Sequence, residues 1–299
     1  GGGGWPLSAW CTPDGEPFYV GTYFPPEPRG NHPGFTELCT RIADSWADPD
    51  QRKEMIRRAM QWTESARDEL EAVPAQPSEP PKPELLQDAA AAAVRGYDEG
   101  FGGFGSQGPK FPMPGRVDLL LRAYAATGRE AVLHAATGTL DGMAAGGIYD
   151  QIGGGFHRYA VDRQWTIPHF EKMLYDNAEL PMVYINAYRL TGKPLYARIA
   201  IETLAFLDRE LRHDEGGFYS TLDARSRPPA SRGGGDTPVE GAYYAWTPGE
   251  VDELLEEDAA AVTKARYGIT SGGNFERGTT VPTRSQSIAA IAADHDQSV

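Results

Sequence analysis

A Gly-Gly-aromatic signature recurs along the chain and constrains the fold more than any other feature. It occurs three times in strict form and once more loosely: Gly102-Gly103-Phe104, Gly154-Gly155-Phe156, Gly216-Gly217-Phe218 and Gly272-Gly273-Asn274-Phe275. The four phenylalanines are 52, 62 and 57 residues apart, a spacing that accommodates one helix, a loop, a second helix and a loop. This spacing predicts an array of helical hairpins. The alternative is four unrelated helix ends capped by glycine.

The segments between the signatures have apolar residues at helical spacing. We expect helices over residues 85–97, 117–126, 131–144, 169–190, 194–211 and 287–293, and short strands over 217–223 and 241–246. A closed ring of six hairpins would need about 340 residues at this period, whereas Leu85 to Val299 is 215 residues. If the array is an (α/α)6 toroid, this chain therefore contains only part of it.

The residues before the array follow another pattern. Residues 5–24 predict a β-hairpin, and apolar stripes predict helices over 35–46 and 55–70. Five prolines between Pro74 and Pro83 are incompatible with a continuous helix or a central strand. We therefore predict an α/β domain over 1–73, a semi-rigid linker over 74–84 and a helical domain over 85–299. The fold class is mainly α.

Composition excludes several classes of function. The net charge of −14 argues against nucleic-acid binding, which needs a basic face. No apolar run is long enough for a membrane helix. Cys11 and Cys39 do not form a disulfide framework or a metal site, and they suit a reducing cytoplasm. We expect a small-molecule ligand and no metal or cofactor. Because the chain begins with Gly1 rather than Met, we expect it to be an internal piece of a longer protein.

The segment from Gly146 to Asn177 concentrates histidines, carboxylates and aromatic residues. Sugars are held by polar side chains together with aromatic rings, and this segment has that composition. Near it we expect substrate to be bound by Asp150, Gln151, Arg158, Trp165, Tyr175, Asn177, Asp223 and Trp246. On a helix that starts near Pro168, we expect His169, Lys172 and Asp176 to share one face. A purely structural polar network remains the alternative.

Catalysis is expected to involve His157, His169, Glu171 and Asp176. Proton abstraction beside a sugar carbonyl needs a base whose pKa is near neutrality, which suits the two histidines. Glycosidic hydrolysis would instead need a pair of carboxylates. The residues available for that reaction are Asp150, Glu171, Asp176 and Asp223.

Several longer strings resemble the spermatogenesis-associated protein 20-like family of thioredoxin-domain-containing proteins. They are Gly3-Gly4-Trp5-Pro6, Gly21-Thr22-Tyr23-Phe24-Pro25-Pro26, Pro109-Lys110-Phe111-Pro112, Gly147-Ile148-Tyr149-Asp150-Gln151, Gly154-Gly155-Phe156-His157-Arg158-Tyr159 and the segment Pro168 to Asn177. The resemblance implies the C-terminal half of a thioredoxin-like domain, followed by an incomplete (α/α)6 toroid like that of N-acylglucosamine 2-epimerase.

The same resemblance implies details of the site. Pro6 looks like the cis-proline that faces the active cysteines of thioredoxins, while the Cys-x-x-Cys of the family would lie upstream of Gly1. The family's Asp-Ala-Asp-Ser appears here as Asp223-Ala224-Arg225-Ser226, and Pro181 interrupts a predicted helix. The first functional hypothesis is a sugar isomerase or epimerase that acts by histidine proton transfer. The alternative is a redox or protein-binding factor whose toroid is a docking platform.

Overall fold

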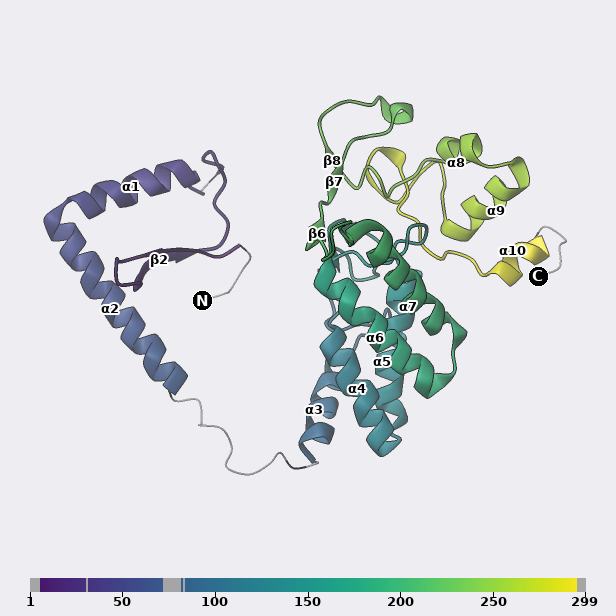
Figure 1. Ribbon diagram of the computed structural model, residues 1–299, viewed down its shortest axis with the longest axis horizontal. Coiled ribbons are helices and arrows are strands. Elements are labelled where there is room, and N and C mark those ends of the chain that lie inside the picture. Colours follow the sequence, from purple (N-terminus) through teal and green to yellow (C-terminus); the bar gives the residue numbers. More distant parts are fainter. Residues whose placement is uncertain (1–5, 31, 72–81, 83, 295–299) are drawn as a thin grey trace. The chain divides into compact units, whose positions relative to one another are not determined.

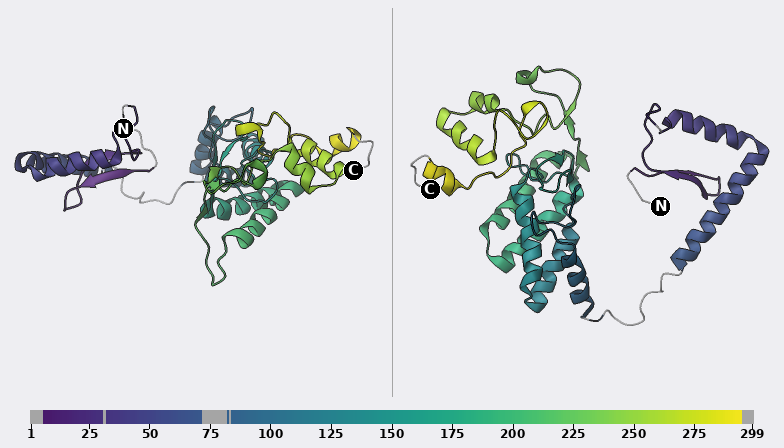
Figure 2. Two further views of the ribbon diagram at one scale, coloured as in Figure 1. Left: turned by 90° about the horizontal axis from the view of Figure 1, so that it is seen from above. Right: turned by 180° about the vertical axis from the view of Figure 1, so that it is seen from behind.

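The computed structural model describes residues 6–30, 32–71, 82 and 84–294 (Figures 1 and 2). The chain divides into two compact units, residues 1–81 and 82–299. Of the predicted linker over 74–84, only Lys82 and Glu84 lie within the described residues. The bond expected to be cis, before Pro6, involves Trp5 and also lies outside them.

The first unit contains the predicted hairpin and two helices. Strand β1 (Ser8–Cys11) pairs antiparallel with β2 (Pro17–Gly21), and α1 (Phe35–Ala47) and α2 (Pro49–Glu71) follow. The hairpin packs on α1 because the ring of Phe18 stacks on that of Trp46, with 5.6 Å between the ring centroids. Helix α2 begins earlier than predicted because the Asp48 carboxylate accepts the first free amides of the helix, from Asp50 and Gln51.

The second unit is built on helices that pack side by side (Figure 1). They are α3 (Glu84–Arg95), α4 (Pro114–Thr127), α5 (Glu130–Ala145), α6 (Leu174–Thr191) and α7 (Pro194–Phe206), which continues as a π-helical turn over Leu207–Leu211. Two-residue loops join α4 to α5 and α6 to α7. Each loop starts with a left-handed glycine that ends the helix, Gly128 or Gly192. The predicted fold class, mainly helical with a partial α/β segment before a helical-hairpin array, is confirmed.

The helix predicted over 169–190 starts late, at Leu174. Before it, β4 (Pro168–His169) pairs with β3 (Tyr159–Ala160), and β5 (Lys172–Met173) pairs with β6 (Thr221–Leu222). Because the backbone groups of these residues pair across strands, no helix can form there. The helical face predicted for His169, Lys172 and Asp176 is therefore wrong.

The remaining elements cover one end of the helical array. Strand β7 (Arg225–Ser226) pairs with β8 (Val239–Glu240), and α8 (Pro248–Leu254), α9 (Glu257–Tyr267) and α10 (Ile288–Asp294) follow. Short 3₁₀ turns lie at Ala230–Arg232 and Glu276–Gly278. The strand predicted over 241–246 is wrong, because residues 241–244 form a turn that starts at Gly241, with φ of 71°. Of the strand predicted over 217–223, only β6 forms.

The three strict Gly-Gly-aromatic signatures share the left-handed conformation of their glycines, although the third turn is one residue shorter than the first two. Both glycines of each copy have positive φ, between 71° and 95°. A backbone bridge then joins the aromatic residue to a residue before the turn, in the pairs Tyr97–Phe104, Tyr149–Phe156 and Arg212–Phe218. The signature therefore marks a repeated structural unit rather than unrelated helix caps. The fourth copy differs, since only its second glycine has positive φ.

Candidate active site

The first two signature turns each hold a buried lysine–aspartate pair. Lys110 Nζ lies 2.6 Å from Asp98 Oδ2 and donates to the carbonyl oxygen of Gly102. In the next turn, Lys172 Nζ lies 2.7 Å from Asp150 Oδ2 and donates to the carbonyl oxygen of Gly154. Both lysine side chains are only 1 % exposed. Lys110, which forms a backbone bridge with Ala160, thus binds the first turn, and Lys172 of β5 binds the second.

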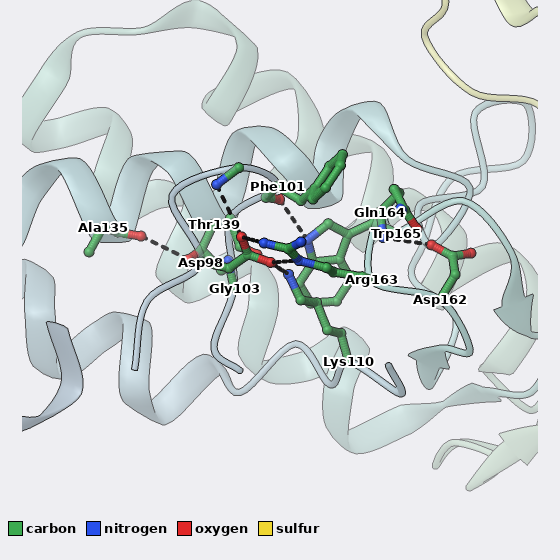
Figure 3. A network of polar contacts seen from close by, with 12 residues as sticks. Asp98, Phe101, Gly103, Lys110, Ala135, Thr139, Asp162, Arg163, Gln164 and Trp165 are labelled. Carbon is green, nitrogen blue, oxygen red and sulfur yellow. Dashed lines mark hydrogen bonds and ion pairs between the residues drawn. The ribbon is translucent and has the colours of Figure 1, made fainter. Parts of the chain in front are cut away.

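The first pair belongs to a closed polar network (Figure 3). Arg163 donates from Nε and Nη2 to the two carboxylate oxygens of Asp98, both at 2.7 Å, and its guanidinium lies over the ring of Phe101. Hydrogen bonds from Arg163 and then Lys110, working against the effect of burial, hold the pKa of Asp98 well below its usual range. A carboxylate so fully surrounded has a structural role.

Trp165 belongs to the same network (Figure 3). Its indole Nε1 donates to the carbonyl oxygen of Phe101 at 3.0 Å, and Lys110 Nζ lies 5.5 Å from the ring centroid. The residue is fully buried. Its ring therefore has no free face on which a sugar could stack, and the binding role predicted for Trp165 does not fit the structure.

The second pair is less enclosed. The Asp150 side chain is 12 % exposed, and its Oδ1 accepts the amides of Ile152 and Gly153. Lys172 Nζ lies 4.4 Å from the ring centroid of Phe206 and 4.8 Å from that of Tyr244. Although burial alone would raise the pKa of Asp150, the nearby Lys172 holds it below its usual value. Asp150 is therefore an ionised acceptor with one edge still accessible.

His157 is buried behind this second pair. Its Nδ1 lies 3.1 Å from the carbonyl oxygen of Phe170, and the ring meets that of Tyr244 edge-on at 4.7 Å. Burial, and then the charge of Lys172, lower its pKa to about 3. His157 is thus a neutral imidazole with Nδ1 as donor, and it is a weaker base than the sequence-based role requires.

His169 lies between two carboxylates. Its Nδ1 is 2.7 Å from Glu240 Oε1 and its Nε2 is 3.3 Å from Glu171 Oε2, while Glu171 also accepts from Arg158 Nη1 at 2.8 Å. The His169 side chain is 26 % exposed and stacks on Tyr159. The structure thus brings two predicted catalytic residues, His169 and Glu171, into contact beside the predicted ligand residue Arg158. An accessible imidazole held by carboxylates can accept and return a proton.

Three further predicted site residues, Tyr175, Asp176 and Asn177, lie at the start of α6 and differ in their burial and hydrogen bonding. Asp176 is buried, and among the described residues its Oδ2 has no hydrogen-bond partner; the same is true of Arg158 Nε. Asn177 bonds both the amide and the carbonyl of Phe156, so it joins the second turn to α6. Tyr175 is exposed. In the described part of the chain, Asp176 is therefore a buried carboxylate with an unpartnered oxygen.

Asp176 predicts a pH-dependent stability. Burial, reinforced by Glu179, raises its pKa to about 7 from an ordinary 3.8. Between pH 4 and 7, the folded chain keeps a proton on Asp176 that the unfolded chain releases. The free energy of unfolding is therefore highest below pH 4, and it falls as the pH rises through 7. Asp176→Asn, which stays neutral, should raise the free energy of unfolding at pH 8 by about 2 kcal/mol, after allowing for the favourable helix N-terminus. Urea titrations at pH 4 and 8 measure this. An equal gain at both pH values would contradict it.

A cavity of about 510 Å³ lies beside the second turn. Its lining includes Asp150, Ile152 and Gly153 of the second turn and three aromatic residues, Tyr243, Tyr244 and Trp246. Arg232 and Glu250 form part of the wall, and they are paired at 2.9 Å. The cavity brings together two predicted substrate-binding residues, Asp150 and Trp246, which are 96 residues apart in the sequence.

Two further predicted ligand residues lie elsewhere. The Gln151 amide donates to the carbonyls of Ala144 and Gly146 and accepts from Arg284, so it is occupied in packing. Asp223 is exposed, does not line the cavity and accepts the amide of Arg225 in a local turn. Sequence reasoning missed the cavity residue Tyr243 and the pair Lys110–Asp98. A Tyr-Asp dipeptide before each of the first two signatures was the available signal.

Within residues 6–30, 32–71, 82 and 84–294, no three His, Cys, Asp or Glu side chains converge so that they could hold a metal ion. None of the helices in the described part of the chain combines the length and hydropathy needed to cross a membrane.

Comparison with known proteins gives partial matches of two kinds. Residues 1–67 match the Thioredox_DsbH family, described as a protein of unknown function, DUF255. The chain is 38 % identical to spermatogenesis-associated protein 20 of Homo sapiens over 294 residues, which is 92 % of this chain and 36 % of the human protein. It is 35 % identical to the uncharacterized protein B0495.5 of Caenorhabditis elegans, covering 93 % of this chain and 38 % of that protein.

The chain thus spans little more than a third of the length of these relatives. Among solved structures, cellobiose 2-epimerase from Spirochaeta thermophila matches with a TM-score of 0.41 at 20 % identity, covering 53 % of this chain and 45 % of that one. D-mannose isomerase matches with a TM-score of 0.34 at 21 % identity, covering 38 % and 30 %. The resemblance predicted from the sequence is confirmed: over nearly its whole length, the chain is similar to the spermatogenesis-associated protein 20-like family.

Proposed function

We propose that the helical unit binds a neutral polyhydroxy molecule of the sugar class in the cavity beside the second turn. The observation that carries the proposal is the lining of this cavity. It combines three aromatic rings (Tyr243, Tyr244 and Trp246) with the ionised acceptor Asp150. Aromatic faces suit the C–H surfaces of a sugar ring, and a few fixed polar groups orient its hydroxyls.

Proton transfer is the chemistry we propose for this ligand, as in an isomerase or epimerase. Of the two predicted histidines, His169 is the accessible one, with its side chain 26 % exposed. It lies outside the cavity lining, so proton transfer requires a ligand that extends past this lining and displaces Glu171 from Nε2. Its partner Glu240 directly precedes the turn that carries Ala242 and Tyr243 into the cavity wall. Glycosidic hydrolysis is less well supported, since Asp150 is engaged by Lys172 and Asp176 is buried.

The second candidate is a redox or protein-binding factor, in which the helical unit is a docking platform. The family match of residues 1–67 favours it. Cys11 on β1 and Cys39 on α1 are both free and do not form a Cys-x-x-Cys pair, so the second candidate relies on the Cys-x-x-Cys that the resemblance implies. Free thiols also agree with the cytoplasmic location that we propose.

Thermal unfolding of the full chain with a panel of aldoses, N-acyl sugars and disaccharides tests the first proposal. Saturation to about 100 times Kd adds about 2.7 kcal/mol, which should raise the melting temperature by about 5–10 °C. Tyr243→Ala should abolish the increase, because this ring is an exposed part of the cavity wall.

The matched control is Tyr219→Ala, which removes another exposed tyrosine of the same unit, outside the cavity. It should leave the sugar-induced increase unchanged. No stabilisation by any sugar in the panel would contradict the proposal and favour the docking alternative. Equal loss of stabilisation in both variants would show that the sugar binds elsewhere.

A further inference from the structure

The first two signature turns correspond residue by residue. The amide of Asp98 donates to the carbonyl of Gly103, and that of Asp150 donates to the carbonyl of Gly155. The carbonyl of each aspartate accepts from the residue four positions later, Gly102 or Gly154. Each carboxylate accepts a lysine on Oδ2 and the amide of the residue two positions later on Oδ1. The two carboxylates are therefore held in the same way.

What surrounds the two carboxylates differs. In the first turn, the guanidinium of Arg163 binds the open edge of Asp98 and lies over Phe101 (Figure 3). In the second turn, Gly153 stands at the position of Phe101, and no arginine binds Asp150 within the described part of the chain. Asp150 and Gly153 both line the cavity instead. In the second turn, the carboxylate and the residue that corresponds to Phe101 thus face a cavity, while Arg209 binds the carbonyl of Gly153 rather than the carboxylate.

Among the residues that the structure describes, the carboxylate of Asp150 has one hydrogen-bond donor fewer than that of Asp98. A carboxylate has about four hydrogen-bond acceptor positions. Asp98 fills four, with one from Gly100, one from Lys110 and two from Arg163. Asp150 fills three within the described residues, with the amides of Ile152 and Gly153 on Oδ1 and Lys172 on Oδ2. The remaining position is on Oδ2.

We infer that Asp150 Oδ2 determines specificity by accepting one hydroxyl of the ligand in this cavity, at the place that Arg163 occupies beside Asp98. This inference rests on the proposed sugar-class ligand. A neutral hydroxyl fits better than a second cation, because Lys172 already neutralises Asp150 and the other charged residues of the lining, Arg227 and Arg232 with Glu250 and Glu253, balance one another. Aromatic contacts for such a ligand are available from Tyr243, Tyr244 and Trp246 in the same lining.

Two matched double variants of the full chain test the inference. Asp150→Asn/Lys172→Met removes the second buried pair as a unit, so no unpaired buried charge remains. Its Kd for the best sugar of the panel, measured by calorimetry, should be weaker by about 10- to 100-fold, as expected for a lost charged hydrogen bond. Asp98→Asn/Lys110→Met removes the first pair and leaves Arg163 without its carboxylate, but the Arg163 side chain is 41 % exposed and can be solvated. Its Kd should equal that of the unmodified chain.

The outcomes separate this inference from the proposed function. If no sugar binds the unmodified chain, the proposed function fails. If a sugar binds and both double variants retain its affinity, only the role of Asp150 fails. A second measurement, a series of singly deoxygenated sugars, does not depend on the folding of any variant. One hydroxyl whose removal weakens binding tenfold or more supports the inference, and equal affinity for the whole series overturns it.

Discussion

Lys172→Met should lower the free energy of unfolding by about 3–5 kcal/mol, the usual cost of breaking a buried ion pair from one side. Lys172 is 1 % exposed and bonds both Asp150 and the carbonyl of Gly154. Its removal leaves the nearly buried carboxylate of Asp150 without a cation. The substitution also removes the side-chain contacts between β5 and the second turn. Urea unfolding of the full chain, followed by near-ultraviolet circular dichroism, measures the change.

The control for this experiment removes both charges together. Asp150→Asn/Lys172→Met leaves no unpaired buried charge, so its stability should lie closer to that of the unmodified chain than to that of the single variant. A single variant as stable as the unmodified chain would show that the pair does not hold the turn in place.

Gly155→Ala should lower the free energy of unfolding by about 2–5 kcal/mol. Gly155 has φ of +80°, a left-handed conformation that costs other residues about 1–2 kcal/mol. An added Cβ would also collide with the ring of Phe206, which is buried. Overpacking of this kind adds about 1–3 kcal/mol. The same urea titration measures the sum.

Gly217→Ala provides the matched control in the third signature. Gly217 has φ of +79° and also precedes a phenylalanine, but an added Cβ would meet nothing within 4 Å. Its cost should therefore be only the backbone part, about 1–2 kcal/mol. The two variants together separate backbone strain from packing. If both variants lost the same free energy of unfolding, contact with Phe206 would not be the reason that a glycine is required at position 155.

The helices could be predicted from the sequence, because the spacing of apolar residues and the glycines that end helices are local signals. The glycines Gly128 and Gly192 end helices whose apolar stripes could be read directly. The start of α6 was missed for the opposite reason. Pro168 to Met173 has apolar residues compatible with a helix, yet its backbone pairs with strands from 159–160 and from 221–222. Such pairing depends on residues distant in the sequence.

The candidate site was predicted in composition but not in arrangement. His169 and Glu171 are close in sequence, so their contact could be anticipated, whereas their partner Glu240 comes from β8. Trp165 looks like a ligand-stacking residue by type, yet the small residues Gly103, Gly142 and Gly146 pack around it and enclose it. Whether an aromatic side chain faces a cavity or the core depends on such tertiary neighbours, which no local pattern reveals.

We propose that the second signature turn opens onto a ligand cavity, whereas the carboxylate of the first turn is bound by Arg163. A crystal structure of the full chain with its best-bound sugar, at a concentration well above Kd, tests this most directly. We expect sugar density between Asp150 and the rings of Tyr243 and Trp246, with one hydroxyl at hydrogen-bond distance from Asp150 Oδ2. Density at any other place, with this cavity empty, would contradict it.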